Sequence, residues 1–159
     1  MISKMKKHIS STKGLAYVPI CFLVMFICLL TSIVMLYMGL MAQVQIQKRD
    51  VKLKLDSHIT KYAVEAFDSI KQGEKYTEVI DLATLKQTAY TSLGFSASDA
   101  SYTYENGNCT MSRPAITALS GEGFGLSATY TASFPIVWNG KVYADLEVPL
   151  TVTSYYKFK

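Results

Sequence analysis

The feature that most constrains this chain is a run of residues without a single charge, from Gly14 to Ala42. As an α-helix this run of roughly 29 residues would be about 43 Å long, against a bilayer hydrocarbon core of ~30 Å. It also exceeds the apolar part of a secretory signal, typically about 7–15 residues, and Leu40-Met41-Ala42 lacks the small-x-small cleavage pattern. The run therefore predicts a retained transmembrane helix over residues 14–42.

The flanks of this run bear on orientation. Residues 1–13 carry Lys4, Lys6, Lys7 and Lys13 and no acid, and the flank after the run also offers four bases, Lys48, Arg49, Lys52 and Lys54. Because acids count little in the positive-inside rule, the two flanks have equal numbers of basic residues and do not decide the orientation. We expect a cytoplasmic 1–13 tail, since the C-terminal part has the pattern of an extracytoplasmic β-rich domain. The predicted localisation is therefore the cell membrane, single-pass, with the N-terminus cytoplasmic.

The chain after the apolar run begins with a helical pattern over residues 43–73. Its apolar face is spaced by three, four and seven residues and includes Val51, Leu55, Ile59, Tyr62 and Ala66. No breaker separates it from the apolar run, so we expect one continuous helix from about Val18 to Gln72. This predicted packing stripe must be covered, either by the chain's own β domain alone or also by neighbouring subunits.

The remainder, residues 74–159, predicts a single α+β domain, because about 115 residues outside the apolar run suffice for only one compact core. A short helix is expected from Glu78 to Leu93, with Thr77 as N-cap and Gly94 just past its end. An alternating strand at Ser101–Glu105 is followed by an Asn106-Gly107 turn and a return strand through Cys109–Ser112. The glycine-rich stretch from Arg113 to Gly125 is predicted to be a loop.

Two long strands, 126–138 and 142–152, alternate apolar and polar residues around Asn139-Gly140. Asn-Gly ordinarily forms a two-residue turn, but that register would place Phe134 opposite Asp145. A three-residue loop over 138–140 would instead place Phe134 opposite Ala144, so that every apolar residue meets another. We therefore expect a three-residue loop with Gly140 in the left-handed region and a bulge.

The expected fold class is α+β: a single N-terminal transmembrane helix continues into a long amphipathic stem helix, which packs on a small antiparallel β-sheet domain. No catalytic residue, cofactor or metal site is predicted, so we do not expect an enzyme. The two histidines, His8 and His58, have no ligand cluster around them, and His58 is expected to be solvated. Asp145 and Glu147 are expected on the solvated face of the sheet.

Cysteine spacing and charge exclude further classes of protein. Cys21, Cys28 and Cys109 build neither a disulfide framework nor a zinc site. Of the net charge of +4, residues 76–159 contribute five bases and seven acids. A folded domain that binds nucleic acid would carry a basic stripe interleaved with aromatic residues, so no nucleic-acid partner is predicted.

A basic tail, a glycine before an uninterrupted apolar helix, a continuing amphipathic helix and a small β domain resemble the bacterial type IV pilin-like proteins, and more specifically the TadE-like pseudopilins of tight-adherence pili. The segment Lys13-Gly14-Leu-Ala-Tyr-Val-Pro19 occupies the place of that family's Gly-led processing motif. Residues 126–156 resemble its C-terminal β region. The resemblance implies that Gly14 and Leu15 flank a prepilin-peptidase cut. The fifth residue after that cut is Pro19, where such pilins usually carry Glu.

The resemblance implies a structural function, that of a minor pilin-like subunit whose helix serves for membrane storage and assembly. The implied partners are the lipid bilayer and other pilin-like subunits or the pilus assembly machinery. A membrane-tethered extracytoplasmic binding module that does not polymerise is the alternative. Assembly requires the helix over 43–72 to contact other chains, whereas a simple tether does not.

Overall fold

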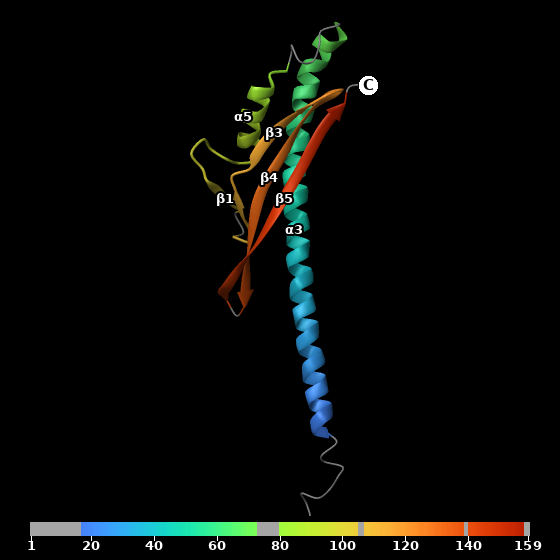
Figure 1. Ribbon diagram of the computed structural model, residues 1–159, viewed down its shortest axis with the longest axis vertical. Helices are drawn as coiled ribbons and strands as arrows, with labels where there is room; N and C mark the ends of the chain where they lie inside the picture. The colour runs from blue at the N-terminus through green and yellow to red at the C-terminus, as the bar shows by residue number, and fades with distance from the viewer. Residues whose placement is uncertain (1–16, 73–79, 105–106, 139, 158–159) are drawn as a thin grey trace, which may run out of the picture. The chain divides into compact units, whose positions relative to one another are not determined.

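The computed structural model describes residues 17–72, 80–104, 107–138 and 140–157. They form two helices, α3 (Tyr17–Lys71) and α5 (Leu82–Ser92), and one five-stranded antiparallel sheet (Figure 1). The α+β class, with a long N-terminal apolar helix and an antiparallel sheet, is confirmed. The chain divides into two compact units, Met1–Ala42 and Gln43–Lys159, called here the first and the second unit.

Helix α3 is continuous from Tyr17 to Lys71, as its uninterrupted pattern predicted. Its apolar part is long and apolar enough to cross a membrane, and its most apolar stretch contains no buried residue. Thr31 is a polar residue inside this part. Its hydroxyl donates to the carbonyls of Ile27 and Cys28 at 3.0 and 2.9 Å, which satisfies the group within the helix itself.

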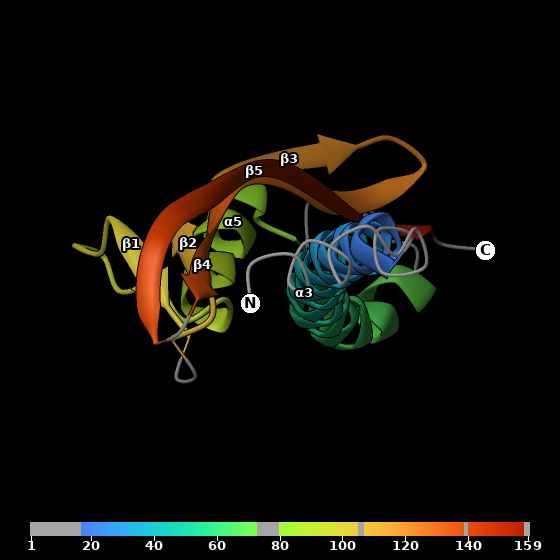
Figure 2. The same ribbon diagram turned by 90° about the horizontal axis from the view of Figure 1, so that it is seen from below.

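The sheet is built around β4 (Gly123–Trp138). One edge of β4 pairs along its whole length with β5 (Lys141–Lys157), and its other edge pairs first with β3 (Ala115–Ser120) and then with β2 (Thr110–Ser112). β1 (Ser101–Thr103) completes the sheet beside β2. The β4–β5 ribbon is curled (Figure 2).

The predicted loop over Arg113–Gly125 is wrong, because this stretch contains β3 and the start of β4. Ile116 is buried between exposed Ala115 and Thr117, which is the alternation of a half-buried strand. The glycines are there because the backbones approach closely. A Cβ on Gly125 would lie 2.4 Å from the Ser154 carbonyl oxygen, and one on Gly123 would lie 1.9 Å from that of Tyr156.

The predicted three-residue loop of the long hairpin is also wrong. Trp138 pairs with Lys141, which leaves a two-residue turn, and Gly140 has the expected positive φ of 73°. A bulge follows at once: Val137 pairs with Val142, but Ile136 pairs with Ala144, so Tyr143 is the extra residue. The predicted pairing of Phe134 with Ala144 is wrong, since Phe134 pairs with Leu146 and Ala144 with Ile136. The expectation that apolar residues face each other, and that Phe134 does not pair with Asp145, is confirmed.

Helix α5 begins later than predicted. Its N-cap is Asp81, whose carboxylate accepts hydrogen bonds from the backbone N–H groups of Ala83 and Thr84 at 2.9 and 3.3 Å. The predicted N-cap Thr77 lies outside the described residues. Gly94 follows the helix with φ of 95°, as expected for a C′ residue.

The core of the second unit combines one face of α3 with α5 and the inner face of the sheet. Its fully buried side chains come from all three elements and include Val51, Leu55, Ile59, Leu85, Leu93, Phe124, Leu126 and Phe134. The Ser154 hydroxyl of β5 also donates to the carboxylate of Asp56 on α3. Residues 43–71 of α3 are therefore joined to both the helical and the β part of the second unit.

Candidate functional site

A pocket of about 420 Å³ lies within the second unit, between α3 and the β1–β2 end of the sheet. The helix contributes residues at steps of three and four, which places them on one face. The sheet side contributes aromatic residues and a thiol. The lining consists of Gln43, Ile46, Gln47, Asp50, Lys54, Tyr102, Tyr104, Asn108, Cys109 and Phe134.

Polar side chains inside this pocket form a linked set. The Tyr104 hydroxyl donates to Asp50 Oδ2 at 3.2 Å, and Asp50 Oδ2 also forms an ion pair with Lys54 Nζ at 3.2 Å. Lys54 Nζ lies 5.4 Å from the centre of the Tyr104 ring, a cation–π distance. Gln47, which is only 5% exposed, donates from Nε2 to the sulfur of Met111 at 3.8 Å. The carboxylate of Asp50 is thus held between a hydroxyl and an ammonium group.

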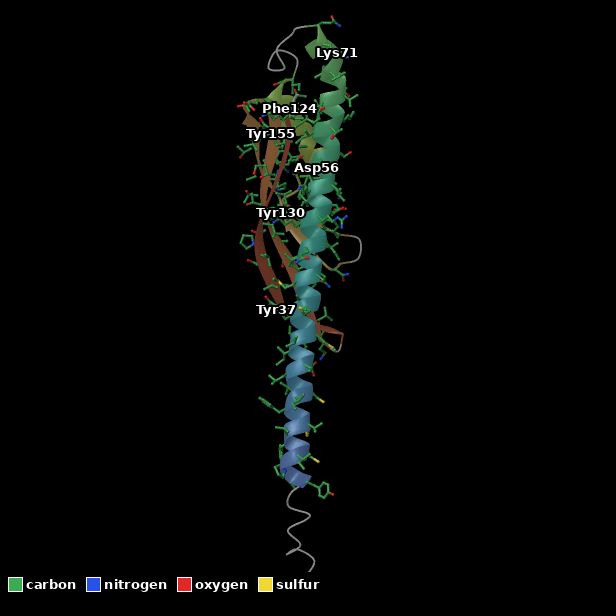
Figure 3. All side chains as sticks on the ribbon, turned by 90° about the vertical axis from the view of Figure 1, so that its right-hand side faces the viewer. Tyr37, Asp56, Lys71, Phe124, Tyr130 and Tyr155 are labelled. Carbon is green, nitrogen blue, oxygen red and sulfur yellow. The ribbon has the colours of Figure 1, made fainter. Side chains whose placement is uncertain are left out.

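The Tyr130 hydroxyl is the unusual group near this pocket. It is buried on β4 (Figure 3), and among the described residues it has no hydrogen-bond partner. Burial raises the pKa of Tyr130 far above its ordinary value, and repulsion from the ionised forms of Tyr104, Cys109 and Asp50 raises it further. A buried hydroxyl without a partner costs free energy, so a water or ligand atom that reached it would be stabilising.

The titratable hydroxyl and thiol groups of the pocket stay protonated near neutral pH. Burial raises the pKa of Tyr104 to about 12, against a smaller lowering by the hydrogen bond with Gln47. Burial also raises the pKa of the Cys109 thiol. Because the thiolate is the nucleophilic form of cysteine, this environment suits hydrogen bonding rather than covalent catalysis.

A second polar cluster joins α3 to α5. His58 Nε2 lies 3.2 Å from both the Leu85 carbonyl oxygen and Thr88 Oγ1, and Thr88 Oγ1 lies 3.0 Å from the Tyr62 hydroxyl. The His58 and Tyr62 rings meet edge to face, with their centres 5.1 Å apart. The expectation of a solvated His58 is therefore wrong: the histidine positions α5 against α3. Sequence spacing could not reveal this, since Thr88 is thirty residues away.

The predicted packing stripe lies within the second unit. Val51, Leu55, Ile59 and Ala66 are at most 2% exposed, and Tyr62 is half-buried against Thr88. These side chains are covered by the chain's own residues and are not available to another subunit in this conformation. The predicted processing residues, Gly14 and Leu15, lie outside the described part of the chain.

A different apolar face of α3 is exposed. Ile46, Leu53, Val64 and Phe67 are 68%, 58%, 68% and 46% exposed. Ile46, Leu53 and Phe67 are spaced by multiples of seven residues, and Val64 is one helical turn before Phe67, so the four share a side of the helix. We call these four residues the outer stripe. The seven-residue spacing of these residues is present in the sequence, but the buried stripe on the other side of the helix has the stronger apolar pattern.

Other chemistry is sparse in the described residues. They contain no group of three or more His, Cys, Asp or Glu side chains that could hold a metal ion. Asp145 and Glu147 are both exposed on β5, as expected for the solvated face. Lys157 and Glu122 form an exposed ion pair between β5 and the turn before β4. The pocket and the outer stripe are therefore two features of the second unit that could contact another molecule, on chemistry and on exposed apolar area respectively.

Comparison with known proteins adds no family to this description. No protein-family model, no curated protein and no solved structure matches the chain.

Proposed function

We propose that this chain is a membrane-anchored structural subunit of a pilin-like assembly. The apolar part of α3 serves as the anchor, and residues 43–71 serve as an assembly stem. The observation that carries the proposal is the exposed outer stripe on the same continuous helix as the apolar run. Large apolar side chains in register on one helix face favour contact with another helix. The layout resemblance to TadE-like pseudopilins supports the same function.

The outer stripe, rather than the buried stripe, is the proposed contact surface. Leu53 is 58% exposed, while Leu55, two residues later, is fully buried in the core of the second unit. A contact between subunits through Leu53 buries apolar area at about 25 cal/mol per Å² without disturbing the fold. A contact through Leu55 would require the second unit to open first.

The test compares Leu53→Asp with Leu55→Asp in a chain whose three native cysteines are replaced and which carries Val64→Cys for crosslinking. In membranes of the native host, Val64→Cys should give disulfide-linked dimers on mild oxidation. Leu53→Asp should abolish the dimers and leave the unfolding midpoint unchanged. Leu55→Asp should unfold the second unit, since an unpaired buried charge costs several kcal/mol. Absence of dimers in the Val64→Cys chain that retains Leu53 and Leu55 would overturn the proposal.

The second candidate function is a membrane-tethered binding module that does not polymerise. The Tyr130 hydroxyl, which has no hydrogen-bond partner in the described part of the chain, and the pocket of about 420 Å³ favour it. The same variants separate the two functions. Under this alternative, Leu53→Asp would leave the biological function of the chain intact, whereas filling the pocket would abolish it.

A further inference from the structure

The tip of the β4–β5 hairpin is an exposed apolar surface separate from the pocket and the outer stripe. Val137, Val142 and Tyr143 are 53%, 59% and 67% exposed. Val137 and Val142 are directly paired across the ribbon, so their side chains share a face. Tyr143 is the extra residue of the bulge. We call these three residues the hairpin tip.

The ribbon that carries the hairpin tip has no other strand beside it in the described residues. β3 pairs with β4 only over Phe124–Thr129, and β2 only at Ala132 and Ser133. From Phe134 outward, β4 pairs with β5 alone. A two-stranded ribbon is marginally stable by itself in water, so one that exposes three large apolar side chains gains stability from an apolar surface.

The hairpin tip lies at the Gln43 end of the second unit. Along β4, Leu126 is paired with Ser154, which bonds to Asp56, and Ala132 is paired with Met111, which contacts Gln47. Phe134 then lines the pocket with Gln43 and Ile46. β4 therefore follows α3 backwards toward Gln43, and the residues after Phe134 continue in that direction (Figure 1).

This end of the second unit is basic. Lys48, Arg49 and Lys52 on α3 are exposed, and so is Lys141 at the turn of the hairpin. Asp50 at this end forms an ion pair with Lys54. Asp145 is exposed on β5, two residues after the bulge, and lies opposite Pro135 in the strand pairing. Basic side chains beside aromatic and aliphatic ones match the boundary between anionic headgroups and acyl chains.

We propose that the hairpin tip inserts into the headgroup–acyl boundary of the bilayer that holds the apolar part of α3. Gln43 is bonded directly to Ala42, the last residue of the uncharged run, so in the proposed anchored chain the second unit begins where that run leaves the membrane. Val137, Val142 and Tyr143 enter the boundary, and Lys141 reaches the headgroup phosphates. This contact gives the second unit a second attachment to the membrane and rests on the anchoring proposed above.

Trp138, the single tryptophan of the chain, lies in the sequence next to the hairpin tip and gives a direct readout. The full chain is reconstituted into phosphatidylcholine–phosphatidylglycerol vesicles whose acyl chains are brominated close to the headgroup. Fluorescence of Trp138 should be strongly quenched by these lipids and protected from acrylamide, whatever the protein-to-lipid ratio. The triple variant Val137→Ser, Val142→Ser, Tyr143→Ser should lose this quenching, whereas Tyr155→Ser, an exposed tyrosine at the other end of β5, should keep it.

The outcomes separate the proposals. Quenching that is absent while the chain still floats with the vesicles would overturn the membrane contact and leave the anchor intact. Protection from acrylamide without lipid quenching, growing with protein density, would assign the hairpin tip to a second copy of the chain and overturn the lipid contact. A chain that fails to float with vesicles would overturn both the anchor and the contact.

Discussion

At the scale of single residues, close backbone contact and buried polar groups decide what each position tolerates. Gly125 sits where the β4 backbone meets β5, and a Cβ there would lie 2.4 Å from the Ser154 carbonyl oxygen and 2.9 Å from Tyr155 Cα. Gly121, four residues earlier, would place a Cβ 3.2 Å from the Tyr155 hydroxyl, the far end of a flexible side chain. The two glycines look alike in the sequence but differ in what surrounds them.

Gly125→Ala should therefore destabilise the second unit by ~3 kcal/mol, the upper part of the range for overpacking, because backbone atoms of β5 must move. Gly121→Ala should change the free energy of unfolding by less than about 1 kcal/mol, because the Tyr155 side chain can rotate away. Urea unfolding of the full chain in detergent, followed by circular dichroism, measures both. Equal stability of the two variants would show that the strands separate easily at Gly125.

At the scale of elements, the hairpin shows how the sequence resolves a conflict. Asn139-Gly140 requires a two-residue turn, and the apolar residues further along require an even-to-even register. The bulge at Tyr143 satisfies both, since it shifts the register by one residue just after the turn. The parity of the pairing could be predicted from the alternating residues. The partners could not, because a bulge moves the extra residue from the loop into the strand without changing the pattern.

Deletion of Tyr143 should leave a regular hairpin, with Val137–Val142 followed directly by Ile136–Ala144. The cost should be small, within about 1 kcal/mol, since no pairing on the core side is lost. Deletion of Val148 removes the same number of residues but flips the side chains on one side of it to the wrong face. That variant should lose several kcal/mol or fail to fold. Urea unfolding distinguishes the two variants. An equal loss of unfolding free energy in both would contradict the interpretation that the bulge at Tyr143 adjusts the strand register.

For the other elements too, local sequence patterns made some predictable, whereas contacts between distant residues left others unpredicted. Helix α3 was predictable because one uninterrupted pattern specifies it, and the end of α5 because Gly94 marks it. β3 was missed because the glycines that follow it are typical of loops, whereas here they allow close approach to β5. The pocket was missed because its residues come from Gln43–Lys54 and Tyr102–Phe134, and no local pattern joins Asp50 to Tyr104.

At the scale of the whole molecule, the chain combines two units with different surfaces. The described part of the first unit exposes large apolar side chains all round, from Tyr17 to Met41, as a lipid-facing helix does. The second unit buries its core and exposes charged residues on α3 and β5. The boundary at Ala42 and Gln43 coincides with the end of the uncharged run. Both surfaces are compatible with the proposed membrane anchor joined to an aqueous domain.

The full chain should remain in the membrane pellet after alkaline carbonate treatment and dissolve only with detergent, since the apolar segment is held by burial in hydrocarbon. A tag placed after Lys159 should be removed by protease added to intact cells or protoplasts, because we expect the second unit outside the cytoplasm. A tag placed before Met1 serves as the control and should be protected. Protection of the C-terminal tag with cleavage of the N-terminal one would reverse the topology.

The position of β5 in the chain has a consequence for biosynthesis. β5 leaves the ribosome after every other described element, yet it pairs along the whole of β4 and bonds to Asp56 through Ser154, 98 residues away. Until it emerges, one edge of β4 is open and the buried face of α3 lacks part of its cover. The second unit therefore cannot complete its fold until β5 has been made. Under the topology proposed above, this delay would favour export, because a secretion channel passes a polypeptide as an extended, unfolded chain.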